Sequence, residues 1–164
     1  MKDRFVDGSN GALLTDQYQL TMAQAYVAEG MHDDQGAFSL FARALPETRN
    51  FLLVAGLGSA LEYLETLQFS VDDIDYLYSL DTFSDAFLDY LRQFEFEGDI
   101  WALPEGTPAF PDEPWIEVEA PIPQAQIAET IILNQLNSPT SLASKAARVV
   151  EAAGGVASDR LVAD

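Results

Sequence analysis

Residues 12–26, ALLTDQYQLTMAQAY, decide the fold of this chain and predict an amphipathic helix. Thr15 or Asp16 can cap the first free backbone N–H groups, and Gly30 supplies a stop. The residues that recur at helical spacing, and that we expect to dock as one largely apolar face, are Tyr18, Thr21, Met22, Ala25 and Tyr26. A helix that only fills a core gains little from an acid and a phenol in its opening turn.

After this helix, residues 36–43 alternate in polarity and predict a strand that ends at Arg43. An amphipathic helix follows between Leu53 and Leu64. Ser70 and Asp73 have the spacing of a capping box and predict a short helix over 71–79. Ser84 opens another helix. Its expected buried face is rich in aromatic residues and consists of Phe83, Phe87, Tyr90, Leu91 and Phe94.

Beyond Phe94, glycine and proline divide the chain into short pieces that predict strands at about 95–103, 107–110 and 115–120. Pro123 suits the first turn of a helix, which runs to about 136, with Ala125, Ala128, Ile132 and Leu136 on its apolar face. Residues 137–139, Asn-Ser-Pro, predict a break. A last helix over 139–153 has Leu142, Ala146, Val149 and Ala153 on its apolar side, and residues 160–163 begin one more strand. This order predicts the α+β class with a small, mainly antiparallel sheet.

The bulk composition favours one domain and the start of a second, which we place at 1–121 and 122–164. The chain has 164 residues, 48% of them hydrophobic, and a formal net charge of −19. Such a charge repels nucleic acid and anionic membranes. No apolar run reaches the ~18 residues of a membrane span, and the start lacks a signal peptide, so we expect a cytoplasmic protein. The absence of cysteine excludes disulfides and thiolate sites. The acid excess fits either high-salt adaptation or simple solubility.

The stretch ALLTDQYQLTMAQAY resembles the N-terminal signature of nicotinate phosphoribosyltransferases, which typically read L-L-T-D-x-Y-x-L-T-M. Further similar stretches occur in the same order at 38–57, 96–121 and 142–155. The resemblance implies the N-terminal domain of a type II phosphoribosyltransferase, packed against an irregular α/β barrel that begins near residues 160–164. It covers almost the whole chain but not the whole family member. The family's phosphorylated histidine lies beyond a downstream G-x-R-R-type segment.

The resemblance implies an enzyme of NAD salvage. It joins nicotinate to phosphoribosyl diphosphate, coupled to ATP hydrolysis and assisted by Mg²⁺, and yields nicotinate mononucleotide and diphosphate. It also implies a homodimer. For the 164 residues alone we expect no turnover, no catalytic residue, no metal site and no bound cofactor. The alternatives are a non-catalytic fragment that dimerises or caps a separate barrel chain, and a relative that uses nicotinamide or quinolinate.

Tyr18 and Asp16 are the first candidates for substrate binding. The ring of Tyr18 can stack on a flat heteroaromatic acid, although a helical tyrosine more often packs in a core. By resemblance it packs against nicotinate, usually in the site of the neighbouring subunit. Asp16 has a sufficient role as a helix cap, and the resemblance adds a polar contact to the base or ribose.

Three cations complete the candidate set. Arg43 suits phosphate because its planar guanidinium makes paired hydrogen bonds, and by resemblance it lies near the phosphoribosyl or diphosphate group, but an exposed salt bridge explains it equally well. Lys145 and Arg148 share a helix face with Ser141 and form either a phosphate-facing stripe or a solvated face. His32 is the only histidine, lacks companion ligands at metal spacing, and receives no catalytic role.

Overall fold

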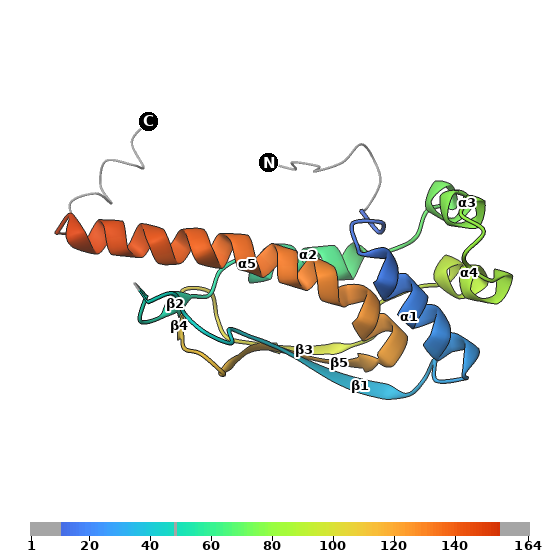
Figure 1. Cartoon of the computed structure of the whole chain (residues 1–164), viewed down its shortest axis with the longest axis horizontal. Helices are drawn as coiled ribbons and strands as arrows, with labels where there is room; N and C mark the ends of the chain where they lie inside the picture. Colours follow the sequence, from blue (N-terminus) through green and yellow to red (C-terminus); the bar gives the residue numbers. More distant parts are fainter. Residues whose placement is uncertain (1–10, 48, 155–164) are drawn as a thin grey trace.

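A computed structural model describes residues 11–47 and 49–154, so most of the N-terminal arm and the strand predicted at 160–163 lie outside the described residues. The elements in chain order are α1 (Gln17–Ala28), β1 (Gln35–Phe41), β2 (Leu52–Leu53), α2 (Leu57–Thr66), α3 (Val71–Ser79), α4 (Asp85–Arg92), β3 (Asp99–Ala102), β4 (Pro108–Ala109), β5 (Pro114–Pro121) and α5 (Ile122–Ala152). Helices gather on one side of a small antiparallel sheet, and the longest helix, α5, runs along the sheet, with α1, α3 and α4 near its N-terminal end (Figure 1). The chain is therefore α+β, as predicted.

The main sheet has the order β1-β5-β3, with both pairings antiparallel. Val118 in the central strand lies opposite Phe38 of β1 and Ile100 of β3, which sets one apolar row across the sheet. This face packs against the first half of α5, while the alternate residues of β1, and Glu117 and Glu119 of β5, face solvent. The alternation of β1 follows the predicted period of two. The short strands β2 and β4 form a separate two-stranded ladder.

Helix α1 differs from its prediction in length and in its buried face. It starts at Gln17, with Asp16 in the N-cap position, and it ends before Gly30, whose φ is +75°. The face that docks on α5 is formed by Gln19, Leu20 and Ala23. The predicted apolar face is therefore wrong, because Tyr18 and Met22 are 51% and 40% exposed. Gln19 takes an inner position because its amide finds buried partners on α5.

Helix α5 is continuous through Pro139, so the predicted break at 137–139 is also wrong. Pro139 has no N–H, which leaves the carbonyl of Gln135 without a helical donor. Side chains hold the following turns instead. Thr140 Oγ1 accepts from the N–H of Ala55 at 3.1 Å, and Ser144 Oγ accepts from the N–H of Leu53 at 2.8 Å. These bonds fix the second half of α5 to the chain beside β2.

The polar contacts of Thr140 and Ser144 also decide which side of α5 packs in its second half. The predicted apolar side lies in solvent, with Leu142 65% and Val149 58% exposed. In the first half the prediction is confirmed, because Ala125, Ala128, Ile132 and Leu136 are all buried. Within residues 11–47 and 49–154, no helix combines the length and apolar character needed to cross a membrane.

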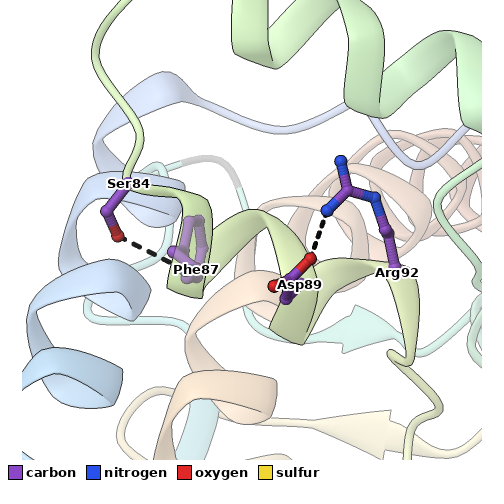
Figure 2. A network of polar contacts seen from close by, with 4 residues as sticks. All are labelled: Ser84, Phe87, Asp89 and Arg92. Atoms are coloured by element: carbon purple, nitrogen blue, oxygen red, sulfur yellow. Dashed lines mark hydrogen bonds and ion pairs between the residues drawn. The ribbon is translucent and has the colours of Figure 1, made fainter.

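The helical pair α3 and α4 follows its prediction closely. Ser70 and Asp73 form the expected capping box, with the N–H of Asp73 donating to Ser70 Oγ at 3.1 Å. Figure 2 shows the start of α4, where Ser84 Oγ accepts from the N–H of Phe87 at 3.3 Å, and an ion pair between Asp89 and Arg92 further along the helix. The expected aromatic face is buried around Phe87, which is 1% exposed.

Replacing Ser70 by alanine should lower the free energy of unfolding by about 1–2 kcal/mol, because the N–H of Asp73 loses its acceptor and the capping box opens. Urea unfolding followed by circular dichroism measures the change. Ser79→Ala is the matched control, since Ser79 is an exposed serine at the other end of α3. Equal losses in both variants would contradict the capping account.

Alkaline pH should destabilise the fold through two tyrosines. Burial and the charge of Asp73 raise the pKa of Tyr63 to about 12, and burial with nearby Glu97 and Asp33 raises the pKa of Tyr90 to about 12. The unfolded chain releases these protons near pH 10, so their contribution is complete below pH 10 and is lost as the pH rises towards 12. Solvent screening limits the loss to about 1 kcal/mol per ring.

Urea midpoints between about pH 8 and pH 11.5 test this sign, because the range spans the pKa of tyrosine in the unfolded chain. Tyr63→Phe and Tyr90→Phe should each flatten the fall in stability above pH 10. Tyr78→Phe, which alters a ring that is 65% exposed, should leave the slope unchanged. A wild-type stability that stays constant over the whole range would exclude the proposed linkage.

Candidate functional site

Tyr18 lies in the first turn of α1 with its ring half in solvent, 51% exposed. It is therefore not part of the core, in contrast to the usual fate of a helical tyrosine. Met22, one turn after it, is 40% exposed, and Leu14, which precedes the helix, is 51% exposed. The first turns of α1 thus present an exposed aromatic ring and an exposed apolar side chain, which suits contact with a flat apolar ligand or with another protein surface.

The hydroxyl of Tyr18 belongs to a polar cluster between α1 and α5. Gln19 Nε2 donates to Tyr18 Oη at 2.7 Å and to Thr130 Oγ1 at 3.2 Å. Gln19 Oε1 accepts from Gln126 Nε2, and the same Gln126 nitrogen donates to Glu129 Oε2 at 2.9 Å. We call Gln19, Gln126 and Thr130 the amide network. Because Gln19 and Gln126 are 0% and 3% exposed, this network is shielded from water and is held in one arrangement.

Asp16 closes the other end of the network. Its side chain makes no capping bond to α1, and its Oδ2 accepts from Thr130 Oγ1 at 3.3 Å. The predicted capping role of the Asp16 side chain is therefore wrong. The carboxylate is used to connect the start of α1 to α5, and it stays exposed beside Tyr18. Asp16 and Tyr18 are thus brought together, as the sequence predicted, but through residues of α5.

The electrostatic environment of Tyr18 favours its neutral form. Partial desolvation, and then the charges of Glu129 and Asp16, raise the pKa of Tyr18 above its ordinary value. The phenol therefore carries its proton at neutral pH. A neutral ring with an O–H group can donate a hydrogen bond while its face stays available for stacking.

Arg43 lines a cleft of about 280 Å³ between the sheet and α5. Its apolar wall includes Leu40 and Ile132, and Glu129 contributes the acidic side of the lining. Arg43 is exposed and follows the end of β1, which stops at Phe41 and so falls short of the predicted strand end. Glu129 belongs to this cleft and also contacts the amide network, so Arg43 and Tyr18 flank the same segment of α5.

Lys145 and Arg148 do not join this site. Both are exposed on the second half of α5, and the separation of Lys145 from Glu129 along the helix corresponds to a rise of about 24 Å. The predicted stripe instead lies near the β2 end of the molecule, where Arg49 Nη1 donates to Ser141 Oγ at 3.5 Å. A phosphate role for Lys145 and Arg148 stays a prediction.

Sequence reasoning missed Gln19, Gln126, Thr130 and Glu129. A glutamine amide in an apolar helix carries no pattern that distinguishes a buried pair from a surface residue. The one available signal was position, because Gln126 and Glu129 lie among the buried alanines and isoleucines of α5. Elsewhere in the described ranges, no three acidic or histidine side chains gather closely enough to hold a metal ion. His32 lies in an exposed turn with Asp33 Oδ2 3.4 Å away.

Comparison with known proteins identifies a consistent set of relatives. A family model described as the nicotinate phosphoribosyltransferase (NAPRTase) N-terminal domain matches residues 13–137. The nicotinate phosphoribosyltransferase pncB2 of Mycobacterium tuberculosis is 50% identical over 145 residues, covering 88% of this chain and 31% of the relative. A nicotinate phosphoribosyltransferase of Bacillus subtilis is 40% identical over 138 residues, covering 84% of this chain and 28% of the relative.

The fold has a solved counterpart as well. The crystal structure of human nicotinic acid phosphoribosyltransferase matches with a TM-score of 0.80 and 35% identity, covering 86% of this chain and 29% of the human chain. The chain therefore spans about a third of the length of the relatives it matches.

Proposed function

The chain belongs to the nicotinate phosphoribosyltransferase family, and on this premise we propose that it forms the N-terminal part of an enzyme that makes nicotinate mononucleotide. In that reaction the pyridine nitrogen of nicotinate bonds to the ribose C1 of phosphoribosyl diphosphate, and the bond from C1 to the diphosphate oxygen breaks. The match of the family model over residues 13–137, including the T-D-x-Y motif, carries this proposal.

In this proposal Tyr18 holds the pyridine ring by stacking, a contact worth about 0.5–1.5 kcal/mol beyond burial. Its exposure supports the role, because the ring is free to contact a ligand. The rest of the binding site would come from another part of the protein or from a second subunit. Asp16 supplies a polar contact beside it. Arg43 helps to hold the phosphates from the neighbouring cleft, where its guanidinium is exposed.

The resemblance also implies ATP and Mg²⁺ for the complete enzyme. Within residues 11–47 and 49–154, no three histidine, aspartate or glutamate side chains gather closely enough to hold a metal ion by themselves, whereas Mg²⁺ is usually held by one or two carboxylates together with substrate phosphates. We propose that binding of both groups needs the part of the family length that this chain does not span, and we expect the 164 residues alone to have no turnover.

A chimera tests the proposal. Residues 13–137 replace the corresponding part of the M. tuberculosis relative, and nicotinate mononucleotide is measured by liquid chromatography with nicotinate, phosphoribosyl diphosphate, ATP and Mg²⁺ present. We expect the chimera to form the product and the 164-residue chain alone to form none. A folded but inactive chimera would contradict the proposed function. Turnover by the chain alone would contradict the expectation that catalysis needs the rest of the family length.

A second candidate is a non-catalytic fragment that dimerises or caps a separate barrel chain. One side of α5 exposes apolar side chains, with Leu142 65% and Val149 58% exposed. This favours a second protein surface that packs against it. Mixing the chain with the separately expressed remainder of the relative distinguishes the two. Restored activity supports the fragment hypothesis, and activity only in the covalent chimera supports the first.

A further inference from the structure

Gln19 is a fully buried polar side chain whose amide contacts Tyr18, the residue placed at the ligand in the proposed function. We propose that Gln19 is a positioning residue that fixes the hydroxyl of Tyr18 as a hydrogen-bond donor directed to the bound ligand. The ligand chemistry is an acceptor oxygen, on either nicotinate or the phosphoribosyl group. This inference rests on the proposed function for the identity of the ligand, but not for the direction of the hydrogen bonds.

The direction of each hydrogen bond is set by two carboxylates. Glu129 is an acceptor when ionised, so the atom of Gln126 that faces it must be the amide nitrogen. That nitrogen also faces Gln19, so Gln19 presents its oxygen to Gln126. The Gln19 nitrogen must then point the other way, towards Tyr18 Oη and Thr130 Oγ1, and both of its hydrogens are used.

The second carboxylate gives the same direction independently. Asp16 is an acceptor when ionised, so Thr130 Oγ1, 3.3 Å from Asp16 Oδ2, donates its one hydrogen there and must accept from Gln19. The network is therefore anchored by Glu129 at one end and by Asp16 at the other. Neither amide can rotate without facing two acceptors or two donors towards each other, which is costly at buried positions.

One hydrogen remains uncommitted at the end of this network. The oxygen of Tyr18 receives a hydrogen bond from Gln19 at 2.7 Å, so the Tyr18 O–H must point away from that amide. Within residues 11–47 and 49–154, the bond accepted from Gln19 is the one hydrogen bond that the Tyr18 hydroxyl makes. The ring is half in solvent, so the hydrogen is available to a ligand. Desolvation, and then the charges of Glu129 and Asp16, raise the pKa of this hydroxyl and so favour its protonated form.

The first test needs no ligand. In the 164-residue chain with ¹³Cζ-labelled tyrosine, the Tyr18 resonance is identified by its absence from Tyr18→Phe, and its pKa is followed by NMR titration. Gln19→Met removes a donor that stabilises the phenolate, so the pKa of Tyr18 should rise by about 0.3 or more. Gln24→Met is the matched control, because the Gln24 amide faces Thr82 and Ser84 and should leave this pKa unchanged.

The second test uses the chimera and a double-mutant cycle. Gln19→Met should raise KM about three- to tenfold for the substrate that accepts from Tyr18, with kcat changed less than about twofold. The substrate whose KM rises, nicotinate or phosphoribosyl diphosphate, identifies the source of the acceptor. In a Tyr18→Phe background the same Gln19→Met change should have no further effect, because the hydroxyl it positions is absent.

Two results would overturn the inference. One is an unchanged Tyr18 pKa in Gln19→Met. The other is a KM effect of Gln19→Met that is equal in the parent chimera and in the Tyr18→Phe chimera, which would mark a purely structural role. If every chimera is inactive while the pKa shift is present, the proposed function fails and the positioning of the hydroxyl stands. The two failures are thus distinguishable.

Discussion

Gly56→Ala should lower the free energy of unfolding by at least about 3 kcal/mol, because the added methyl group meets main chain and not a movable side chain. A Cβ at this position would lie 1.9 Å from the carbonyl oxygen of Gln135. Pro139 leaves that carbonyl without a helical donor, and Gly56, which has no side chain, leaves room for it where α2 contacts α5. Gly56 also has a backbone φ of +99°, a conformation that residues other than glycine rarely adopt.

Gly58→Ala provides the control two residues further along. Gly58 lies inside α2 and no atom is within 4 Å of an added Cβ. This change should be neutral or should stabilise the protein by up to about 1 kcal/mol through helix propensity. Urea unfolding of the two variants measures the difference. Similar stabilities for Gly56→Ala and Gly58→Ala would show that α5 does not approach Gly56 so closely.

Phe87→Ala should cost about 3–5 kcal/mol, the range for deleting a fully buried aromatic ring. Phe87 is 1% exposed, and its ring lies between those of Phe83 and Tyr90, at centroid distances of 5.8 Å and 6.1 Å. The loss combines apolar transfer, a residual cavity and the ring–ring contacts. Because α3 and α4 pack on each other, the cavity should destabilise both helices together.

Phe110→Ala is the matched control, since this ring is 46% exposed and belongs to no aromatic cluster in the described part of the chain. It should change the free energy of unfolding by less than about 1 kcal/mol. Thermal unfolding and hydrogen exchange of α3 amides measure both variants. A small loss for Phe87→Ala, with α3 amides still protected, would contradict the view that this ring holds the helical pair.

The parts of the fold that were predictable are those decided by local chemistry. The capping box of Ser70 and Asp73 and the N-cap Ser84 depend on spacing within one turn, and both appear as predicted. The inward residues of β1 follow from alternation alone. In these segments, interactions between residues that are close in sequence determine the local structure.

The remaining errors share a cause, which is a polar group with a distant partner. Pro139 predicts a break because its effect on Gln135 is visible in sequence, whereas the compensating bonds from Thr140 and Ser144 to residues 53–55 are not. The apolar pattern predicts the wrong buried face for α1 because Gln19 is polar by itself and is buried only together with Gln126. Tertiary hydrogen bonds thus override the apolar pattern in both helices.

The same reasoning limits what was predictable in the candidate site. Tyr18, Asp16 and Arg43 are identifiable from the sequence, and the structure places the first two side by side. The residues that orient them come from α5, far along the chain from α1, and no short motif connects the two segments. Contacts of this kind are visible only once the helices are placed against each other.

The role of Tyr18 as the contact for the pyridine ring is tested most directly by the ratio kcat/KM for nicotinate in the chimera. Tyr18→Ala should lower this ratio about 10- to 100-fold through loss of the stacked ring, while Tyr18→Phe, which keeps the ring, should lose no more than about tenfold. Tyr76→Ala, on α3 and similarly exposed at 55%, should leave the ratio unchanged. A Tyr18→Ala chimera with the ratio of its parent would contradict the account.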